Sequence, residues 1–125
     1  MESSTWQVLV VEDEFDDSQV ISKILRHHGV EVRVAGDGHE CLEVLKTYRP
    51  TMVIMDLALP GMDGWETLKA MRQNPATADI PVIAVTAYHS SSVQEDTEKA
   101  GFNGYMPKPA NPSHLLDHLR GILNA

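Results

Sequence analysis

Residues 52–55, Met-Val-Ile-Met, and residues 82–85, Val-Ile-Ala-Val, say most about how this chain folds. Neither run alternates between apolar and polar residues, so a strand formed there would be buried on both faces. Strands of this kind are typical of parallel sheets that carry helices on either side. The two runs therefore predict the centre of an α/β sheet.

Three further short runs complete a series with a spacing of roughly 20 to 30 residues. The five expected strands are residues 7–11, 31–35, 51–55, 81–85 and, more weakly, 103–106. Each is followed by a segment with helical periodicity. Five such units predict a doubly wound α/β fold with right-handed crossovers. In this architecture, ligands bind beyond the carboxyl ends of the strands.

Apolar residues at helical spacing locate the intervening helices. In the first helix, Val20, Ile21, Ile24 and Leu25 form one expected inward stripe, which Gly29 ends. The second helix is expected to start at Asp37 or Gly38, with Leu42 and Leu45 inward. The third is expected to contain Leu68 and Met71 and to end before Pro75. The last is expected to start at Pro112 and Ser113. Residues 90–99 predict a marginal helix, because only Val93 and, next to the segment, Ala100 are apolar.

The composition fits one compact domain of 125 residues, and a hydrophobic content of 42% argues against disorder. A net charge of −8 disfavours direct binding to nucleic acid, whose phosphates call for a basic face. The single cysteine, Cys41, excludes an internal disulfide and fits a reducing compartment. No apolar run approaches the roughly 20 residues of a membrane span, and no secretory signal is evident. We therefore expect a single cytoplasmic domain.

Carboxylates follow two of the expected strands. Glu12 and Asp13 come directly after the first strand, and Asp56 comes directly after the third. If these strands are neighbours, the three side chains converge, and two unit charges about 4 Å apart repel by about 4 kcal/mol at an effective dielectric of about 20. Such a cluster takes up protons or binds a hard cation, for which Mg²⁺ is the best match. The alternative is that these carboxylates are simply solvated.

The two remaining strand ends offer complementary groups. Thr86 follows the fourth strand with a hydroxyl donor, and Lys108 follows the fifth with a positive charge. A phosphoryl group on Asp56 would need both on its oxygens, while a metal ion neutralises the remaining charge. Taken singly, Thr86 is also typical of a strand-end cap and Lys108 of a solvated surface charge.

Four motifs together resemble the receiver domain of response regulators over nearly the whole chain. They are Val-Glu-Asp at 11–13, Asp-Leu-Ala-Leu-Pro-Gly-Met-Asp-Gly at 56–64, Val-Thr-Ala at 85–87 and Tyr-Met-Pro-Lys-Pro at 105–109. The resemblance implies a flavodoxin-like five-stranded parallel sheet of order 2-1-3-4-5 with five helices. It also implies a single receiver domain over residues 1–125, and we expect no output domain.

The resemblance assigns roles to the acidic residues. Asp56 is expected to be the phosphoacceptor and a metal ligand. Asp13 is expected to bind Mg²⁺ directly, Glu12 through water, and Ala58 through its backbone carbonyl. Mn²⁺ is expected to be able to replace Mg²⁺.

The resemblance also implies a conformational switch. Thr86 and Lys108 are expected to hold the phosphoryl oxygens, and the ring of Tyr105 to turn inward when Thr86 moves. The bond between Lys108 and Pro109 is expected to be cis. Two residues depart from the commonest family pattern: Ala58 replaces a larger or polar side chain, and Tyr88 stands where a polar or charged one is frequent. Both are expected to flank the mouth of the site and modulate it.

The expected partners are a histidine kinase or histidine phosphotransfer protein as donor and a downstream protein target, with no nucleic acid or membrane. We expect a monomer or a weak dimer linked to phosphorylation. Two other classes compete. An aspartyl-phosphate hydrolase resembling the haloacid-dehalogenase superfamily would need a second Asp where Ala58 stands. A flavin protein would need a Ser-, Thr- and Gly-rich loop, whereas residues 12–17 are strongly acidic. The cognate kinase and target cannot be identified from the sequence.

Overall fold

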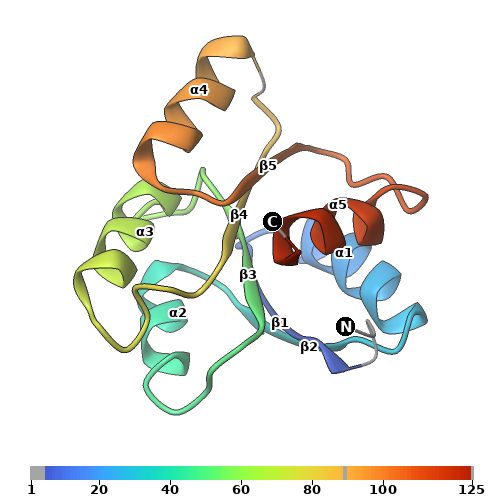
Figure 1. Ribbon diagram of the computed structural model, residues 1–125, viewed down its shortest axis with the longest axis horizontal. Coiled ribbons are helices and arrows are strands. Elements are labelled where there is room, and N and C mark those ends of the chain that lie inside the picture. Colours follow the sequence, from blue (N-terminus) through green and yellow to red (C-terminus); the bar gives the residue numbers. More distant parts are fainter. Residues whose placement is uncertain (1–4, 89, 125) are drawn as a thin grey trace.

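The computed structural model describes residues 5–88 and 90–124. Strands and helices alternate throughout, as predicted (Figure 1). The elements are β1 (Gln7–Val11), α1 (Phe15–His27), β2 (Glu31–Ala35), α2 (Gly38–Val44), β3 (Met52–Asp56), α3 (Gly64–Gln73), β4 (Val82–Thr86), α4 (Ser91–Ala100), β5 (Gly104–Pro107) and α5 (Leu115–Leu123). Within the described part of the chain, none of the helices is long and apolar enough to cross a bilayer.

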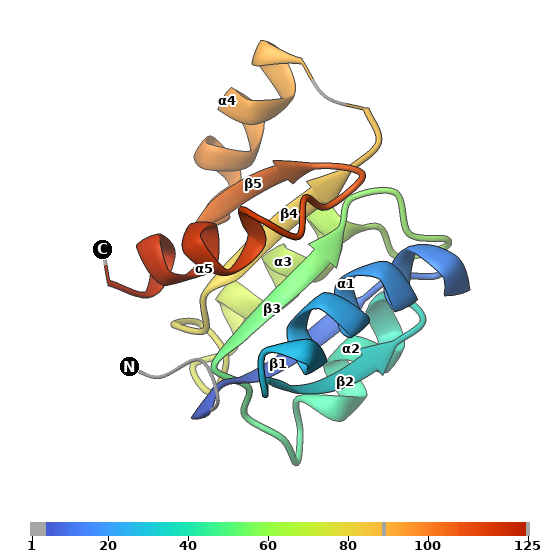
Figure 2. The same ribbon diagram turned by 90° about the vertical axis from the view of Figure 1, so that its right-hand side faces the viewer.

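The five strands form one parallel sheet in the order β2-β1-β3-β4-β5, as the resemblance implied. Helices α1 and α5 cover one face, and α2, α3 and α4 cover the other (Figure 1). A separate apolar core fills the space on each face of the sheet. Because all strands run the same way, their carboxyl ends meet at one edge of the sheet (Figure 2).

The two central strands, β3 and β4, are buried at every position, which confirms the prediction made from their apolar sequences. Three strands differ from the prediction: β3, β4 and β5 each begin and end one residue later than expected. The physical reason is main-chain pairing, which does not depend on side-chain polarity. Asp56 lies opposite Val85, and Thr86 lies opposite Pro107, so both polar residues are the last residues of their strands.

In α1, the predicted inward stripe is wrong at one position. Ile21 and Leu25 are buried, but Val20 is 43% exposed. Two small polar residues, Ser18 and Ser22, occupy the buried face instead. Positions 18, 21, 22 and 25 follow the i, i+3, i+4, i+7 spacing of one helix face, which excludes position 20.

The end of α1, the start of α2 and the end of α3 follow their predicted signals. Gly29 has a positive φ of 81° just after α1. Asp37 caps α2 by accepting a hydrogen bond from the backbone N–H of Glu40 at 2.8 Å. Leu45 is buried as predicted, whereas Leu42 is only half-buried. In α3, the predicted inward residues are buried, and the helix ends before the proline at position 75.

The last two helices differ from prediction in detail. Helix α5 begins at Leu115 rather than at Pro112 or Ser113. Residues 112–114 form a turn instead. The Asn111 carbonyl accepts from the N–H groups of both His114 and Leu115, and its side chain accepts from that of Ser113, so this first turn is not regular α-helix. In α4, Thr97 is the buried residue, while the apolar Ala100 is exposed. Few apolar contacts hold α4, as its sequence predicted.

Arg72, near the end of α3, ties three segments together. Its guanidinium donates to the carbonyls of Ala78 and Ile80, to the carbonyl of Gly101 just after α4, and to the side chain of Asn103 before β5, at 2.7–3.1 Å. The carboxyl end of α4 is thereby fixed to α3 and to the sheet.

Gly64 brings α3 directly against the end of β3. Its N–H donates to the carbonyl of Leu57 at 3.1 Å. A Cβ added to Gly64 would lie 2.4 Å from the carbonyl oxygen of Asp56 and 2.8 Å from the Cα of Leu57. These neighbours are backbone atoms, which cannot turn away. The close approach fixes the segment that follows Asp56.

We therefore expect Gly64→Ala to lower the free energy of unfolding by roughly 1–3 kcal/mol, the usual range for overpacking. Gly121→Ala is the matched control, because Gly121 lies in α5 with no heavy atom within 4 Å of an added Cβ. Alanine there should raise stability by roughly 0.5–1 kcal/mol through helix propensity. Urea unfolding measures both, and equal stability of Gly64→Ala and the natural protein would contradict the close packing.

Candidate functional site

The predicted carboxylate cluster forms at the carboxyl edge of the sheet. Strands β1 and β3 are neighbours, with Val11 opposite Met55, so the residues that follow them come together. Oxygen atoms of Glu12, Asp13 and Asp56 all lie within 4.8 Å of one another. Glu12 and Asp56 are buried, and Asp13 is exposed at the mouth.

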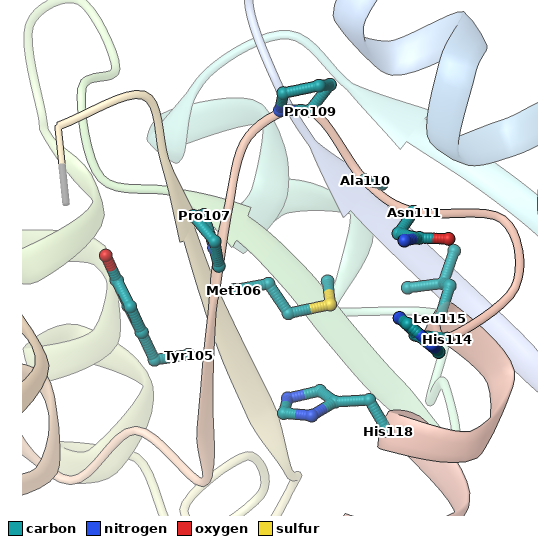
Figure 3. A pocket seen from close by; sticks show the side chains of 9 residues that line it. All are labelled: Tyr105, Met106, Pro107, Pro109, Ala110, Asn111, His114, Leu115 and His118. Carbon is teal, nitrogen blue, oxygen red and sulfur yellow. The ribbon is translucent and has the colours of Figure 1, made fainter.

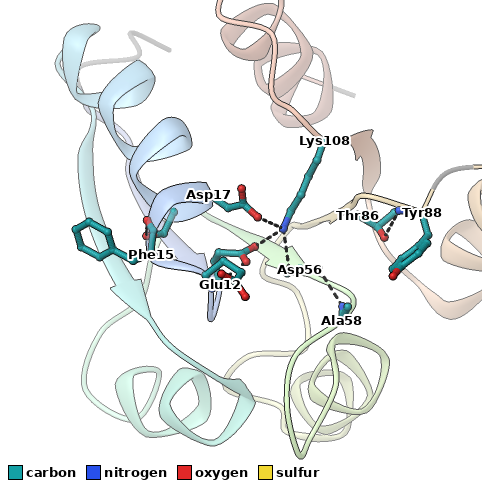
Figure 4. A network of polar contacts seen from close by, with 10 residues as sticks. Glu12, Phe15, Asp17, Asp56, Ala58, Thr86, Tyr88 and Lys108 are labelled. Carbon is teal, nitrogen blue, oxygen red and sulfur yellow. Dashed lines mark hydrogen bonds and ion pairs between the residues drawn. The ribbon is translucent and has the colours of Figure 1, made fainter.

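Lys108 is the cation at the centre of this cluster. Its Nζ donates to Glu12 Oε2 at 2.8 Å, to Asp56 Oδ2 at 2.8 Å and to Asp17 Oδ2 at 3.0 Å (Figure 4). The lysine side chain is only 14% exposed. The ammonium group therefore pairs with three carboxylates, which lie just after β1, in α1 and at the end of β3.

Asp17 is the site residue that the sequence analysis did not assign. It lies in the first turn of α1, which begins four residues after β1 ends. A short β1–α1 connection places the first turn of the helix beside the carboxyl ends of the strands. That position, combined with a carboxylate, is the signal that could have identified Asp17.

Asp56 is held through both of its oxygens. Oδ2 accepts from Lys108, and Oδ1 accepts from the backbone N–H of Ala58 at 2.9 Å. The segment after β3 turns back over the carboxylate to make this second bond, and the Gly64 contact fixes that turn. The side chain of Ala58 is exposed, so it adds no polar group beside Asp56.

Burial and hydrogen bonding shift the pKa values of Glu12, Asp56 and Lys108 in different directions. Burial, followed by the hydrogen bond with Asp56, raises the pKa of Glu12 to about 7. Burial also acts to raise the pKa of Asp56, but hydrogen bonds with Glu12, Lys108 and the Ala58 N–H outweigh it and lower that pKa. Burial acts to lower the pKa of Lys108, yet its bonds to Asp56, Glu12 and Asp17 raise it. Asp56 is thus an ionised carboxylate facing a permanent cation.

The donor set fits a hard divalent cation. The ammonium group of Lys108 pairs with Glu12, Asp17 and Asp56, and a fourth carboxylate, Asp13, lies beside Glu12 and Asp56, so carboxylates outnumber cations. All the available ligand atoms are oxygens, and Asp13 leaves the cluster open to solvent. Oxygen ligands beside open water positions are what Mg²⁺ requires.

The residues predicted to act beyond the carboxylate cluster lie on the other side of Asp56. Thr86 is buried, and its Oγ1 accepts from the N–H of Tyr88 at 3.0 Å (Figure 4). Tyr88 is 77% exposed at the mouth. Tyr105 is half-buried, and its hydroxyl has no hydrogen-bond partner among the described residues. The bond between Lys108 and Pro109 is cis, which confirms that expectation.

The chain matches known proteins over most of its length. Residues 8–120 match the family model of the response regulator receiver domain. An uncharacterized 14.6 kDa protein of Leptolyngbya boryana is 34% identical over 109 residues, which cover 87% of this chain and 83% of that protein. Other curated relatives are longer: the chain spans 53% of the DNA-binding response regulator MtrA of Mycobacterium tuberculosis and 8% of the peroxide stress-activated histidine kinase mak1 of Schizosaccharomyces pombe.

Solved structures show the same fold. The crystal structure of a putative response regulator from Chloroflexus aurantiacus superposes with a TM-score of 0.90 at 33% identity, covering 96% of this chain and 98% of that one. The receiver domain of the sensor histidine kinase PA1611 from Pseudomonas aeruginosa, with a magnesium ion coordinated in its active-site cleft, gives a TM-score of 0.87 at 28% identity and the same coverage. The sequence match, the sheet order and the acidic edge agree, and the chain belongs to the response regulator receiver family, the signalling switches of two-component systems.

Proposed function

We propose that this receiver accepts a phosphoryl group on Asp56 in the presence of Mg²⁺ and signals through protein contacts. The observation that carries the proposal is the environment of Asp56. One of its oxygens faces the Lys108 ammonium at 2.8 Å, and the carboxylates of Glu12 and Asp13 lie alongside. The donor is a histidine of a kinase or phosphotransfer protein, the partners with which this family exchanges phosphate.

The metal site consists of Asp13 and Asp56 as direct ligands, the backbone carbonyl of Ala58 as a third, and Glu12 acting through water. Bound Mg²⁺, or Mn²⁺ in its place, neutralises negative charge on the acidic residues and the incoming phosphoryl group. The PA1611 receiver, with its magnesium ion in the cleft, supports this assignment. So does the excess of carboxylates over cations at this edge of the sheet.

In the transfer step, a carboxylate oxygen of Asp56 bonds to phosphorus. The phosphorus–nitrogen bond to the donor imidazole breaks, and the imidazole nitrogen keeps the electron pair. Lys108 stays paired with Asp56 and shares its charge with the new phosphoryl oxygens, while the Thr86 hydroxyl donates to another. These groups stabilise charge that develops as the phosphoryl group moves in line between nucleophile and leaving group.

The switch couples Thr86 to Tyr105. In the structure, Thr86 Oγ1 accepts a hydrogen bond from the N–H of Tyr88. When the Thr86 hydroxyl turns toward the phosphoryl group, that hydrogen bond is broken. The Tyr105 ring, whose hydroxyl is buried without a partner among the described residues, then turns inward. The neighbouring helix α4 is held by few buried side chains, so a small energy is enough to change its position.

The downstream target binds the face made by α4, β5 and α5. A pocket of about 240 Å³ lies on it between β5 and α5, with Tyr105 on one side and His114 and His118 on the other (Figure 3). The acidic net charge of −8 favours a protein partner over nucleic acid. We propose a cytoplasmic protein that is a monomer or a weak, phosphorylation-linked dimer.

Acetyl phosphate with Mg²⁺ should add one phosphoryl group to the protein, located on Asp56 and detected by mass spectrometry. Chelation of the divalent ion should abolish labelling, because the acidic cluster then repels the donor. Asp56→Asn should not be labelled, whereas Asp79→Asn, a surface carboxylate paired with Arg49, should be labelled normally. Equal labelling of Asp56→Asn would overturn the assignment.

Removing the central cation should destabilise the site. Lys108→Met keeps the apolar part of the side chain but leaves three carboxylates without their shared partner, which should cost on the order of 3 kcal/mol in the absence of divalent ions. Mg²⁺ should restore part of this loss. Lys46→Met is the matched control, since its pair with Glu43 is exposed and worth well under 1 kcal/mol. Urea unfolding that shows equal losses for both variants would contradict the central role of Lys108.

The acyl phosphate on Asp56 should persist longer than it would with polar residues at the mouth. Hydrolysis needs a water in line with phosphorus, and Ala58 has no side-chain atom to orient one, while Tyr88 partly covers the approach. The double variant Ala58→Asn, Tyr88→Glu should lose phosphate roughly 5- to 150-fold faster, the range for one positioning hydrogen bond. Dephosphorylation at saturating Mg²⁺ measures this. An unchanged or slower rate would show that the Tyr88 hydroxyl itself can hold the water or that neither residue matters.

A further inference from the structure

An apolar hollow of about 200 Å³ lies beside the phosphoacceptor, between the segment after β3, the end of β4 and helix α4. It is lined by Leu57, Ala58, Trp65, Thr86, Tyr88 and Val93. None of these residues is charged, and two of them carry large aromatic rings. Such a surface fits a flat apolar group better than a charged one.

The hollow and the phosphoryl site share two of their residues. Ala58 donates its N–H to Asp56 Oδ1 at 2.9 Å, and Thr86 ends the strand next to Asp56. The opposite side of Asp56 is charged, because Lys108 and Asp17 stand there (Figure 4). The acceptor carboxylate therefore lies between a charged wall and an apolar wall.

The geometry of transfer places the leaving group at this mouth. In-line displacement requires the bond that breaks to point away from the attacking oxygen of Asp56. The charged wall, which contains Glu12, Asp13, Asp17 and Lys108, offers no apolar surface to the organic part of a departing carboxylate. The departing carboxylate meets no negative charge in the hollow, where the small Ala58 side chain leaves room.

The two aromatic residues differ in how firmly they are held. Trp65 packs edge-on against Phe102, with ring centroids 5.6 Å apart and planes at 82°, so it forms a fixed floor. Tyr88 is held through its backbone, whose N–H donates to Thr86 Oγ1, and no side-chain hydrogen bond of Tyr88 is found among residues 5–88 and 90–124. Its side chain is 77% exposed and is free to close over a bound ring.

We propose that this hollow is a leaving-group subsite for small-molecule phosphodonors, and that it favours acyl phosphates that carry an aromatic ring. The inference rests on the proposed phosphorylation of Asp56. With benzoyl phosphate, an Asp56 oxygen bonds to phosphorus, the bond from phosphorus to the acyl oxygen breaks, and benzoate leaves with the electron pair. No proton, oxidant or reductant is needed.

The test compares second-order rate constants for phosphorylation by benzoyl phosphate and by acetyl phosphate, at saturating Mg²⁺, in each variant. Taking the benzoyl-to-acetyl ratio within one variant cancels any change in the reactivity of Asp56 itself. Tyr88→Ala should lower the ratio by roughly 2- to 10-fold, the range for one aromatic contact. Trp65→Leu should lower it similarly. Phe15→Ala is the matched control, because Phe15 is a 72% exposed aromatic residue on the charged side of Asp56, and its ratio should not change.

An unchanged ratio in Tyr88→Ala would overturn the subsite, and this variant alters a surface side chain, so folding does not complicate the result. A drop as large in Phe15→Ala would also overturn it, because the preference would then not come from the hollow. If both donors label the protein and the benzoyl-to-acetyl ratio is the same in all variants, the subsite is rejected but the proposed phosphorylation of Asp56 is not. Labelling by neither donor would overturn both proposals.

Discussion

The contact of the Lys108 ammonium with the carboxylates of Glu12, Asp17 and Asp56 is the interaction on which the site depends. These residues come from the end of β1, the first turn of α1, the end of β3 and the residue after β5. Three buried or half-buried anions cannot occupy one small volume without a cation. One side chain therefore both compensates the charge of the acidic cluster and joins the elements that carry it.

The parallel sheet delivers these groups to one place. Because β1, β3 and β4 run side by side in the same direction, the residues at their carboxyl ends arrive at one edge in a fixed order. The strand order also places acidic and apolar residues on different sides of Asp56. Acidic residues lie on the side of β1 and α1, and apolar residues lie on the side of α4. The position of Asp56 between the two sides follows from the place of β3 in the middle of the sheet.

Much of this arrangement could be predicted from the sequence, because it rests on periodicity. The uninterrupted apolar runs identified β3 and β4. The residues that follow the strands identified the cluster of Glu12, Asp13 and Asp56 on the condition that β1 and β3 are neighbours, an order that the family resemblance supplied. Strand ends were less accurate, since main-chain pairing extends through polar residues such as Asp56. Asp17 was missed because its role depends on where the first turn of α1 points, which apolar periodicity does not specify. The start of α5 was misplaced because residues 112–114 form a turn, in which the Asn111 carbonyl accepts from both His114 and Leu115, and regular helix begins only after it.

The hydrogen bonds of Arg72 have a mechanical consequence for α4. The guanidinium holds the carbonyl of Gly101, just beyond the carboxyl end of the helix, and no comparable set of bonds joins the first turn of α4 to the body among the described residues. A ten-residue helix fixed at one end is a lever arm of about 15 Å. Rotation by about 10° about that pivot would carry the free end through roughly 2.6 Å while leaving the pivot in place. The free end is the one beside Tyr88, so the largest displacement of the helix would occur next to the hollow that adjoins Asp56.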